Sequence, residues 1–232
     1  MRNYIYILAA CMLLASCSIK VKKHESTGEV TKEVKVGAFN GIMINLASDM
    51  EYIVSDTFRV VMTASQEDFD NLEECLVRDS MLIFNAKYTS VHGIVLGQSL
   101  CPQIKLKIYG PASLSSVCIT GSSDFTCNDE LQSEDMEVQI EGSGDVNIKG
   151  ITCQNANFVI TGTGNINTTL HKTQQASYVI TGSGDAALNC DSCEQVRFTI
   201  TGAGSVVLDG TLRTLEQNIT GSGKIKDNTR KF

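Results

Sequence analysis

Apolar and polar residues alternate along the second half of the chain, in a pattern that repeats about every 20 residues. One hexapeptide occurs six times, and its first isoleucines follow one another at steps of 21, 20, 20, 20 and 19 residues. Residues two and four positions before each isoleucine are mostly apolar too, which is the period of a β-strand. The copies are ITGSSD, IEGSGD, ITGTGN, ITGSGD, ITGAGS and ITGSGK, beginning at Ile119, Ile140, Ile160, Ile180, Ile200 and Ile219.

The alternation resumes after each hexapeptide, so one repeat holds two short strands joined by a glycine-rich corner. A fixed period of this length is typical of a solenoid. Stacked parallel strands would pair every backbone group with the coil above or below, and the crossover rule favours a right-handed path. We therefore predict an all-β fold, a right-handed parallel β-helix with coils of about 20 residues. Its interior should contain the isoleucine column and an aromatic column of Phe158, Tyr178 and Phe198.

The glycines of the hexapeptide are predicted to be structural, because a tight corner needs backbone angles that a Cβ resists. Ser, Thr, Asp and Asn beside them suit hydrogen bonds to turn backbone. Calcium is the alternative, but the acidic column runs Asp124, Asp145, Asn165, Asp185, Ser205 and Lys224, which is a poor cation site. Ser123 replaces the second glycine in the first copy. The predicted turn glycines are Gly142, Gly144, Gly162, Gly164, Gly182, Gly184, Gly202, Gly204, Gly221 and Gly223.

The region before residue 115 lacks the hexapeptide but keeps strand-like runs. Ile42, Met62, Ile83 and Ile104 stand 20, 21 and 21 residues apart, which suggests irregular coils continuous with the stack. We predict one β-helix domain over residues 34–227, irregular over 34–114 and regular over 115–227, with residues 228–232 as a tail. A short helix is expected near residues 66–75, capped by Ser65.

The N-terminus predicts export. A short apolar run follows Arg2 and ends at Leu14-Ala15-Ser16-Cys17, which is typical of a secretory signal and not of a membrane span. It resembles a bacterial lipobox, so residues 1–16 would be removed, Cys17 lipidated, and residues 17–33 would form a tether. In the alternative, a plain signal peptide is cleaved and Cys17 is incidental. Ser18 and the basic residues after it favour an outer-membrane lipoprotein facing the periplasm over one at the cell surface.

Few residues suggest a catalytic, metal-binding or nucleic-acid-binding role. The net charge of −7 argues against nucleic acid, whose phosphates require a basic face. Cys190 and Cys193 form a lone CxxC that would need two more ligands to hold zinc. A local bridge between these cysteines and an approach of His171 to Asp191 are open alternatives. The sequence predicts no catalytic residue, metal or cofactor.

Phe39-Asn40-Gly41-Ile42, the segment at residues 66–76 before Met81-Leu82-Ile83, and the serial Gly-Ser-Gly-Asp motifs resemble the auto-transporter adhesin head, or GIN, domain family (DUF2807). The resemblance spans residues 34–225 and is specific in its repeat. It implies a β-helical fold in a family common among Bacteroidetes lipoproteins. The resemblance implies no particular catalytic or binding residues in this sequence.

Together these features predict a non-enzymatic, lipid-anchored protein of the cell envelope. Columns of Thr, Ser and Asp on a flat face suggest binding to an envelope glycan or protein. A self-assembling envelope scaffold is one alternative, and a polysaccharide-active β-helix enzyme is another. The sequence leaves the oligomeric state open.

Overall fold

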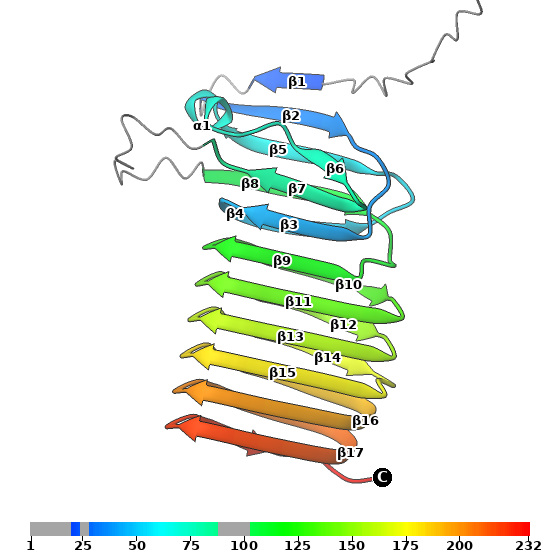
Figure 1. Ribbon diagram of the computed structural model, residues 1–232. Helices are drawn as coiled ribbons and strands as arrows, with labels where there is room; N and C mark the ends of the chain where they lie inside the picture. The colour runs from blue at the N-terminus through cyan, green and yellow to red at the C-terminus, as the bar shows by residue number, and fades with distance from the viewer. Residues whose placement is uncertain (1–19, 24–27, 88–102) are drawn as a thin grey trace, which may run out of the picture.

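The computed structural model describes residues 20–23, 28–87 and 103–232, and within them the chain is almost entirely β-strand. The strands pair into one continuous sheet that winds into a β-solenoid of about six turns (Figure 1). This confirms the predicted β-helical fold. The elements are β1 (Lys20–Lys23), β2 (Glu29–Lys35), β3 (Gly41–Asn45), β4 (Ala47–Val54), β5 (Arg59–Ser65), α1 (Gln66–Asp70), β6 (Leu76–Arg78), β7 (Met81–Asn85), β8 (Gln103–Gly110), β9 (Ser116–Gly121), β10 (Asp124–Gln132), β11 (Asp135–Gly142), β12 (Val146–Thr152), β13 (Asn155–Gly162), β14 (Ile166–His171), β15 (Gln175–Gly182), β16 (Ala186–Gly202), β17 (Ser205–Gly221) and β18 (Lys224–Asp227).

Each coil contributes one strand to each of two faces. The front face of Figure 1 stacks β7, β3, β9, β11, β13, β15 and the second halves of β16 and β17. The rear face stacks β8, β4, β10, β12, β14, the first halves of β16 and β17, and β18. Both stacks are parallel, as the predicted coil requires.

The interior consists of columns of like side chains. Ile140, Ile160 and Ile180 pair in register and are at most 1% exposed. Phe158 stacks on Tyr178 with ring centroids 4.3 Å apart, and Tyr178 stacks on Phe198 at 5.0 Å. Each large apolar side chain buried in this way contributes about 1.5–3 kcal/mol. The predicted isoleucine and aromatic columns are confirmed.

The front-to-rear corners remain hydrogen-bonded from coil to coil. Thr163 N–H donates to the carbonyl of Gly142, and Ser183 N–H to that of Gly162, each at 2.9 Å. The first glycine of the hexapeptide has positive φ, 123° at Gly182, a region that favours glycine. The second glycine, Gly184, does not have positive φ, but a Cβ there would collide with the carbonyl oxygen of Gly164. The second glycine therefore serves close coil-to-coil approach and not the special backbone angle that we expected.

The Asp or Asn that follows the second glycine of a corner accepts a hydrogen bond from the backbone of the next coil. Asp145 Oδ1 accepts from Asn165 N–H at 3.0 Å, Asn165 Oδ1 from Asp185 N–H at 2.9 Å, and Asp185 Oδ1 from Ser205 N–H at 2.7 Å. Ser123 is fully buried, and its hydroxyl donates to the carbonyl of Leu46 in the β3–β4 corner and lies 3.0 Å from the hydroxyl of Ser48 in β4. Side chains thus satisfy corner backbone that the strands leave unpaired.

Before residue 115 the 20- to 21-residue spacing of Ile42, Met62, Ile83 and Ile104 does not mark successive coils. The β3–β4 coil lies between the β7–β8 coil and the β9–β10 coil, so position in the stack does not follow the sequence. Met62 lies in β5, which is antiparallel to β2 and β8. Ile42 pairs with Leu82, not with Ile83. Equal spacing along the sequence does not distinguish a hairpin from a coil.

The predicted tether is wrong over residues 20–23 and 29–33. β1 pairs with β2, and β2 pairs with β5 along its whole length. Val30 and Val34 are 5% and 7% exposed. Lys32, which lies between them in the strand alternation, places its ammonium 3.9 Å from the centre of the Phe69 ring. That lysine interrupts the apolar pattern in the sequence, although its ammonium lies over the buried Phe69 ring.

Helix α1 begins after Ser65, whose hydroxyl accepts from Asp68 N–H at 3.1 Å. The cap agrees with the prediction, but the helix ends at Asp70, because Leu72 already pairs with Ala86. At the C-terminus, residues 228–230 pair with β17 through Asn228 N–H and Arg230 N–H. No helix among the residues described is long and apolar enough to cross a membrane.

Candidate functional site: the front face and its groove

The front face presents columns of short polar side chains, because outward positions of parallel strands in register lie directly above one another. Thr161, Thr181, Thr201 and Thr220 form one exposed column at the ends of the strands. The sequence predicts a threonine column at Thr161, Thr181 and Thr201, and the structure adds Thr220 to it. Amide, hydroxyl and carboxyl side chains form two more columns near the strand starts.

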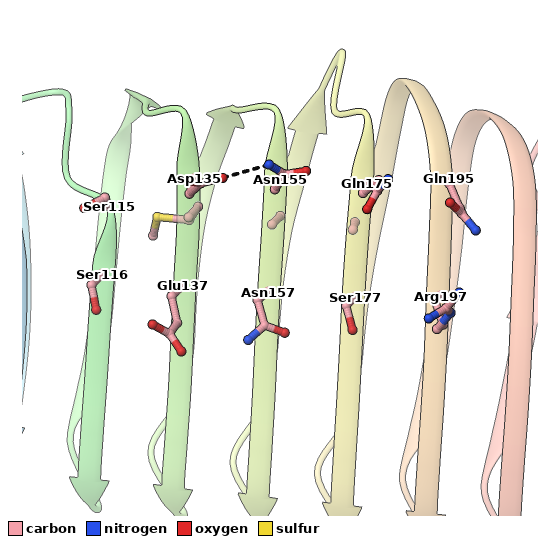
Figure 2. A pocket seen from close by; sticks show the side chains of 13 residues that line it. Ser115, Ser116, Asp135, Glu137, Asn155, Asn157, Gln175, Ser177, Gln195 and Arg197 are labelled. Carbon is pink, nitrogen blue, oxygen red and sulfur yellow. Dashed lines mark hydrogen bonds between the residues drawn. The ribbon is translucent and has the colours of Figure 1, made fainter.

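A groove of about 590 Å³ follows these two columns across five coils (Figure 2). Met136, Ala156 and Ala176 lie between the two columns, and their side chains belong to the buried interior, at most 4% exposed. The polar residues that line the groove are Ser115, Ser116, Asp135, Glu137, Asn155, Asn157, Gln175, Ser177, Gln195 and Arg197.

Two charged groups of the groove, Asp135 on its second coil and Arg197 on its last, are engaged within the protein. Asn155 Nδ2 donates to Asp135 Oδ1 at 2.8 Å. At the last coil, Glu216 accepts from Gln195 Nε2 at 2.7 Å and from Arg197 Nε at 2.8 Å. The hydrogen bond from Arg197 lowers the pKa of Glu216, so this carboxylate remains charged and holds both donors. These contacts fix Asp135, Gln195 and Arg197 within the two columns.

The middle of the groove is polar and uncharged. Asn157, Gln175 and Ser177 lie there, and within the described part of the chain no other protein group engages their side chains. Each amide offers two N–H donors and a carbonyl acceptor, and the serine offers a hydroxyl. The arrangement can hydrogen-bond a ligand that both donates and accepts.

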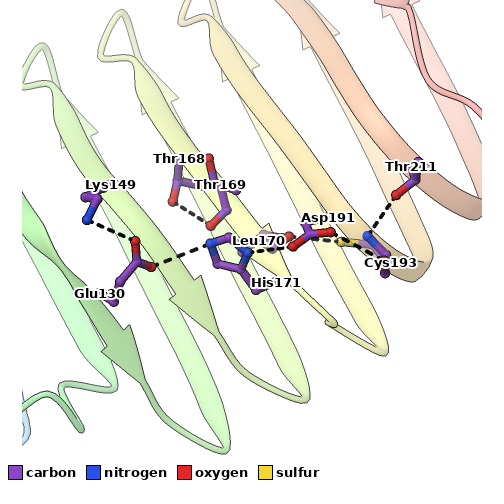
Figure 3. Close-up of polar contacts among 10 residues, drawn as sticks. Glu130, Lys149, Thr168, Thr169, Leu170, His171, Asp191, Cys193 and Thr211 are labelled. Atoms are coloured by element: carbon purple, nitrogen blue, oxygen red, sulfur yellow. Dashed lines mark hydrogen bonds and ion pairs between the residues drawn. The ribbon is translucent and has the colours of Figure 1, made fainter.

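A polar row crosses the rear face and joins four coils (Figure 3). His171 Nδ1 lies 3.0 Å from Asp191 Oδ2, and His171 Nε2 lies 3.5 Å from Glu130 Oε2. Lys149 Nζ lies 3.4 Å from Glu130 Oε1. Glu130 reaches His171 across Gly150, where a Cβ would collide with both side chains. The approach of His171 to Asp191 is confirmed, and this hydrogen bond lowers the pKa of Asp191.

The rear row has the composition of an ion-pair network. Among the residues that the structure describes, no group of three or more His, Cys, Asp or Glu side chains is arranged to hold a metal ion. A groove on this face is lined by Asn147, Asn167 and Lys149, and His171 is not among its lining residues.

Cys190 and Cys193 are 1% and 0% exposed, and their thiols are free. The hydrogen bond with Cys193, together with burial, raises the pKa of Cys190. Burial likewise raises the pKa of Cys127 to about 11. These thiols pack as small apolar groups. The structure therefore does not contain the Cys190–Cys193 bridge that the sequence left open.

The apolar columns of the sequence predict the solenoid but do not by themselves predict the groove. A signal for the groove is present five residues before four of the six isoleucines, at Asp135, Asn155, Gln175 and Gln195. These polar side chains share one column because the coils stack in register. Cys17, the predicted lipid site, lies outside the described residues and stays a prediction.

Solved structures share this fold. A "putative adhesin" from Bacteroides fragilis aligns with a TM-score of 0.65 at 18% identity, covering 88% of this chain and 98% of that one. A "putative lipid binding protein" from Parabacteroides distasonis aligns with the same TM-score and coverage at 20% identity. A "putative adhesin" from Parabacteroides merdae aligns with a TM-score of 0.51 at 17% identity, covering 87% and 98%. At these identities the likeness shows the fold alone.

No curated protein sequence matches the chain at a significant level. The family DUF2807, described as "Putative auto-transporter adhesin, head GIN domain", matches residues 38–187 and 168–229. These two matches cover the glycine-rich corners, both faces of the solenoid and the groove. The chain belongs to the DUF2807, or GIN domain, family.

Proposed function

We propose that this protein is a non-enzymatic binding protein of the cell envelope with an adhesion-like role, and that its front face binds an envelope glycan or protein. The polar columns of the front face carry the proposal. A rigid parallel stack repeats the same hydrogen-bonding groups at every coil, so it can contact a polymer or a flat partner along its length. The descriptions of the family and of two similar structures as adhesins support the same role.

A binding role also suits the charges of the front face. Arg197 is paired with Glu216, and Arg213 with Glu194 at 3.2 Å. Polysaccharide-cleaving chemistry generally needs a positioned acid and base that converge on one bond. The paired charges of this face instead suit a stable recognition surface.

The test measures how much of the purified protein is retained by isolated envelope material. Replacing Thr161 and Thr181 together with lysine puts two long, charged side chains into the flat threonine column, and retention should be lost. The matched control replaces Asn147 and Asn167 with lysine, because these exposed residues occupy equivalent neighbouring coils of the rear face. Equal retention of both double variants would contradict the proposal.

The proposal places the domain at the outer membrane, facing the periplasm and held by lipid on Cys17. Metabolic labelling with palmitate should mark the wild-type protein and the Cys11→Ala variant, since Cys11 lies in the predicted signal. The Cys17→Ala variant should remain unlabelled. If the Cys17→Ala protein is still labelled, the lipid is attached to a residue other than Cys17.

Self-assembly into an envelope scaffold is a second candidate, favoured by the C-terminal end of the solenoid. In the part of the chain described, β18 and the tail cover the first half of β17, whereas no strand covers the second half. Ile219 there is 38% exposed. An open strand edge is a ready site for pairing with a second copy. Light scattering should then show mass increasing with concentration for the wild type and not for Ile219→Lys, and a constant monomer mass would reject this candidate.

A further inference from the structure

We propose that the front groove binds an uncharged glycan chain, with the chain lying along the solenoid axis and crossing the strands. This inference rests on the proposed function and specifies its ligand. The groove passes over β9, β11, β13, β15 and the second half of β16. The four strand-to-strand steps give it a length of about 19 Å.

The chemistry of the groove matches sugar hydroxyl groups. Asn157, Gln175 and Ser177 provide donors and acceptors that the protein itself does not use (Figure 2). Sugar hydroxyls both donate and accept, so an amide side chain can bond two neighbouring hydroxyls at once. Between the two polar columns the floor of the groove is strand backbone, because the Ala156 and Ala176 side chains are buried in the interior.

The charge of the groove selects against polyelectrolytes. Its single arginine is held by Glu216 at 2.8 Å, while Asp135 and Glu137 lie three coils away, next to the end formed by Ser115 and Ser116. An anionic polymer would meet these two carboxylates without a free cation to offset them. A cationic polymer would meet negatively charged groove residues only at Asp135 and Glu137. The uncharged middle therefore fits a neutral chain.

The periodicity of the groove favours a polymer over a folded protein. Successive coils repeat similar polar groups at the strand spacing of about 4.8 Å, which is close to the length of one sugar ring in an extended chain. Protein interfaces generally depend on buried aromatic and other large anchors. The large apolar side chains that are exposed in the described residues, Leu76, Val207, Ile219 and Phe232, lie outside the groove. Its strands are also paired on both sides, so they cannot add a peptide strand.

The experiment titrates the purified full-length protein in detergent with neutral hexasaccharides of mannose, glucose and N-acetylglucosamine, with heparin and alginate as anionic probes. Calorimetry should detect at least one neutral hexasaccharide and no stronger binding of either anionic probe. The corresponding disaccharide should bind at least tenfold more weakly, because it spans fewer coils. The double variant Asn157→Ala, Gln175→Ala should weaken hexasaccharide binding at least tenfold.

The matched control is Asn147→Ala with Asn167→Ala, which removes two exposed amides from the rear face and should leave affinity unchanged. Circular dichroism of all variants checks that the solenoid is intact. Failure of every neutral hexasaccharide to bind, preference for an anionic probe, or equal affinity of the groove and control variants would overturn the inference. If envelope retention still depends on Thr161 and Thr181 while no sugar binds, the proposed function stands with a protein partner and only the glycan inference falls.

Discussion

At the scale of single residues, the structure separates two reasons for the glycines in the corner. Gly182 has φ of +123°, and a Cβ there would also collide with the carbonyl oxygen of Gly162. Gly184 has an ordinary backbone conformation and faces the carbonyl oxygen of Gly164 in the same way. Both glycines let the backbone of one coil approach the next at hydrogen-bonding distance. The hexapeptide is therefore a requirement of stacking at the corner.

Replacing Gly182 by alanine should lower the free energy of unfolding by about 2–4 kcal/mol, because the new Cβ meets both backbone strain and a carbonyl oxygen. The measurement is urea unfolding followed by circular dichroism. Gly37→Ala is the control, since Gly37 lacks positive φ and its nearest neighbour beyond the adjacent residues is 3.9 Å from an added Cβ. Similar losses in the two variants would refute this explanation of the corner.

Tyr178 carries a hydroxyl in the aromatic column without a hydrogen-bond partner among the described residues. An unsatisfied buried polar group costs about 1–3 kcal/mol, so Tyr178→Phe should raise the free energy of unfolding by about 1 kcal/mol. Tyr52→Phe should lower it by a similar amount, because the Tyr52 hydroxyl donates to the Pro111 carbonyl at 2.7 Å. Chemical denaturation of both variants gives the comparison, and a loss of stability in Tyr178→Phe would show that its hydroxyl is satisfied.

At the scale of elements, side-chain ladders link strands that the sequence separates by a whole coil. The rear row joins β10, β12, β14 and β16 through Glu130, Lys149, His171 and Asp191. Because the row is partly exposed, each ion pair contributes little by itself. Its effect on stability should appear mainly as a dependence on pH.

The hydrogen bond from His171 lowers the pKa of Asp191 in the folded protein. A carboxyl with a lowered pKa adds stability above the pKa of the unfolded chain, and this contribution is lost as the pH falls through the folded pKa. Between pH 7 and pH 3 the wild type should therefore lose more stability than Asp191→Asn or His171→Gln. Thermal melting across this range is the measurement, and parallel curves for the three proteins would contradict the assignment.

At the scale of the whole molecule, the N-terminal region is a folded end of the solenoid. β2 and β5 extend the rear face with antiparallel pairs, while β6 and β7 form a hairpin on the front face. Antiparallel strands at this end interrupt the regular stack, and such interruptions limit the growth of a solenoid. The opposite end at β17 is covered over its first half only.

Val34→Ala should lower the free energy of unfolding by about 2 kcal/mol, from lost burial and the cavity left behind. Val34 is 7% exposed and lies in a segment next to the predicted tether. Val207→Ala makes the same chemical change at a residue that is 40% exposed and should be nearly neutral. Guanidinium unfolding measures both, and a neutral Val34→Ala would mean that β2 is not part of the stable fold.

Much of the fold was predictable because its repeat is local in sequence. Ile160 and Ile180 fall into register when the chain advances by one coil, so period and apolar alternation sufficed to predict parallel stacking and the column they form. Where the repeat fails, prediction also failed. Ile42, Met62 and Ile83 have similar spacing, but a turn at Asp79 and Ser80, both with positive φ, makes β6 and β7 a hairpin.

The sequence by itself determined the solenoid, its coil length, the contents of its interior columns and the position of its corners. These follow from hydrophobic period and glycine placement, which act between neighbouring residues and neighbouring coils. Only the tertiary structure decided that the β3–β4 coil lies between two later coils, that β2 belongs to the core, and that polar side chains from five coils border one groove. These features depend on contacts between segments far apart in the chain, and no local pattern encodes which distant strand a given strand will pair with.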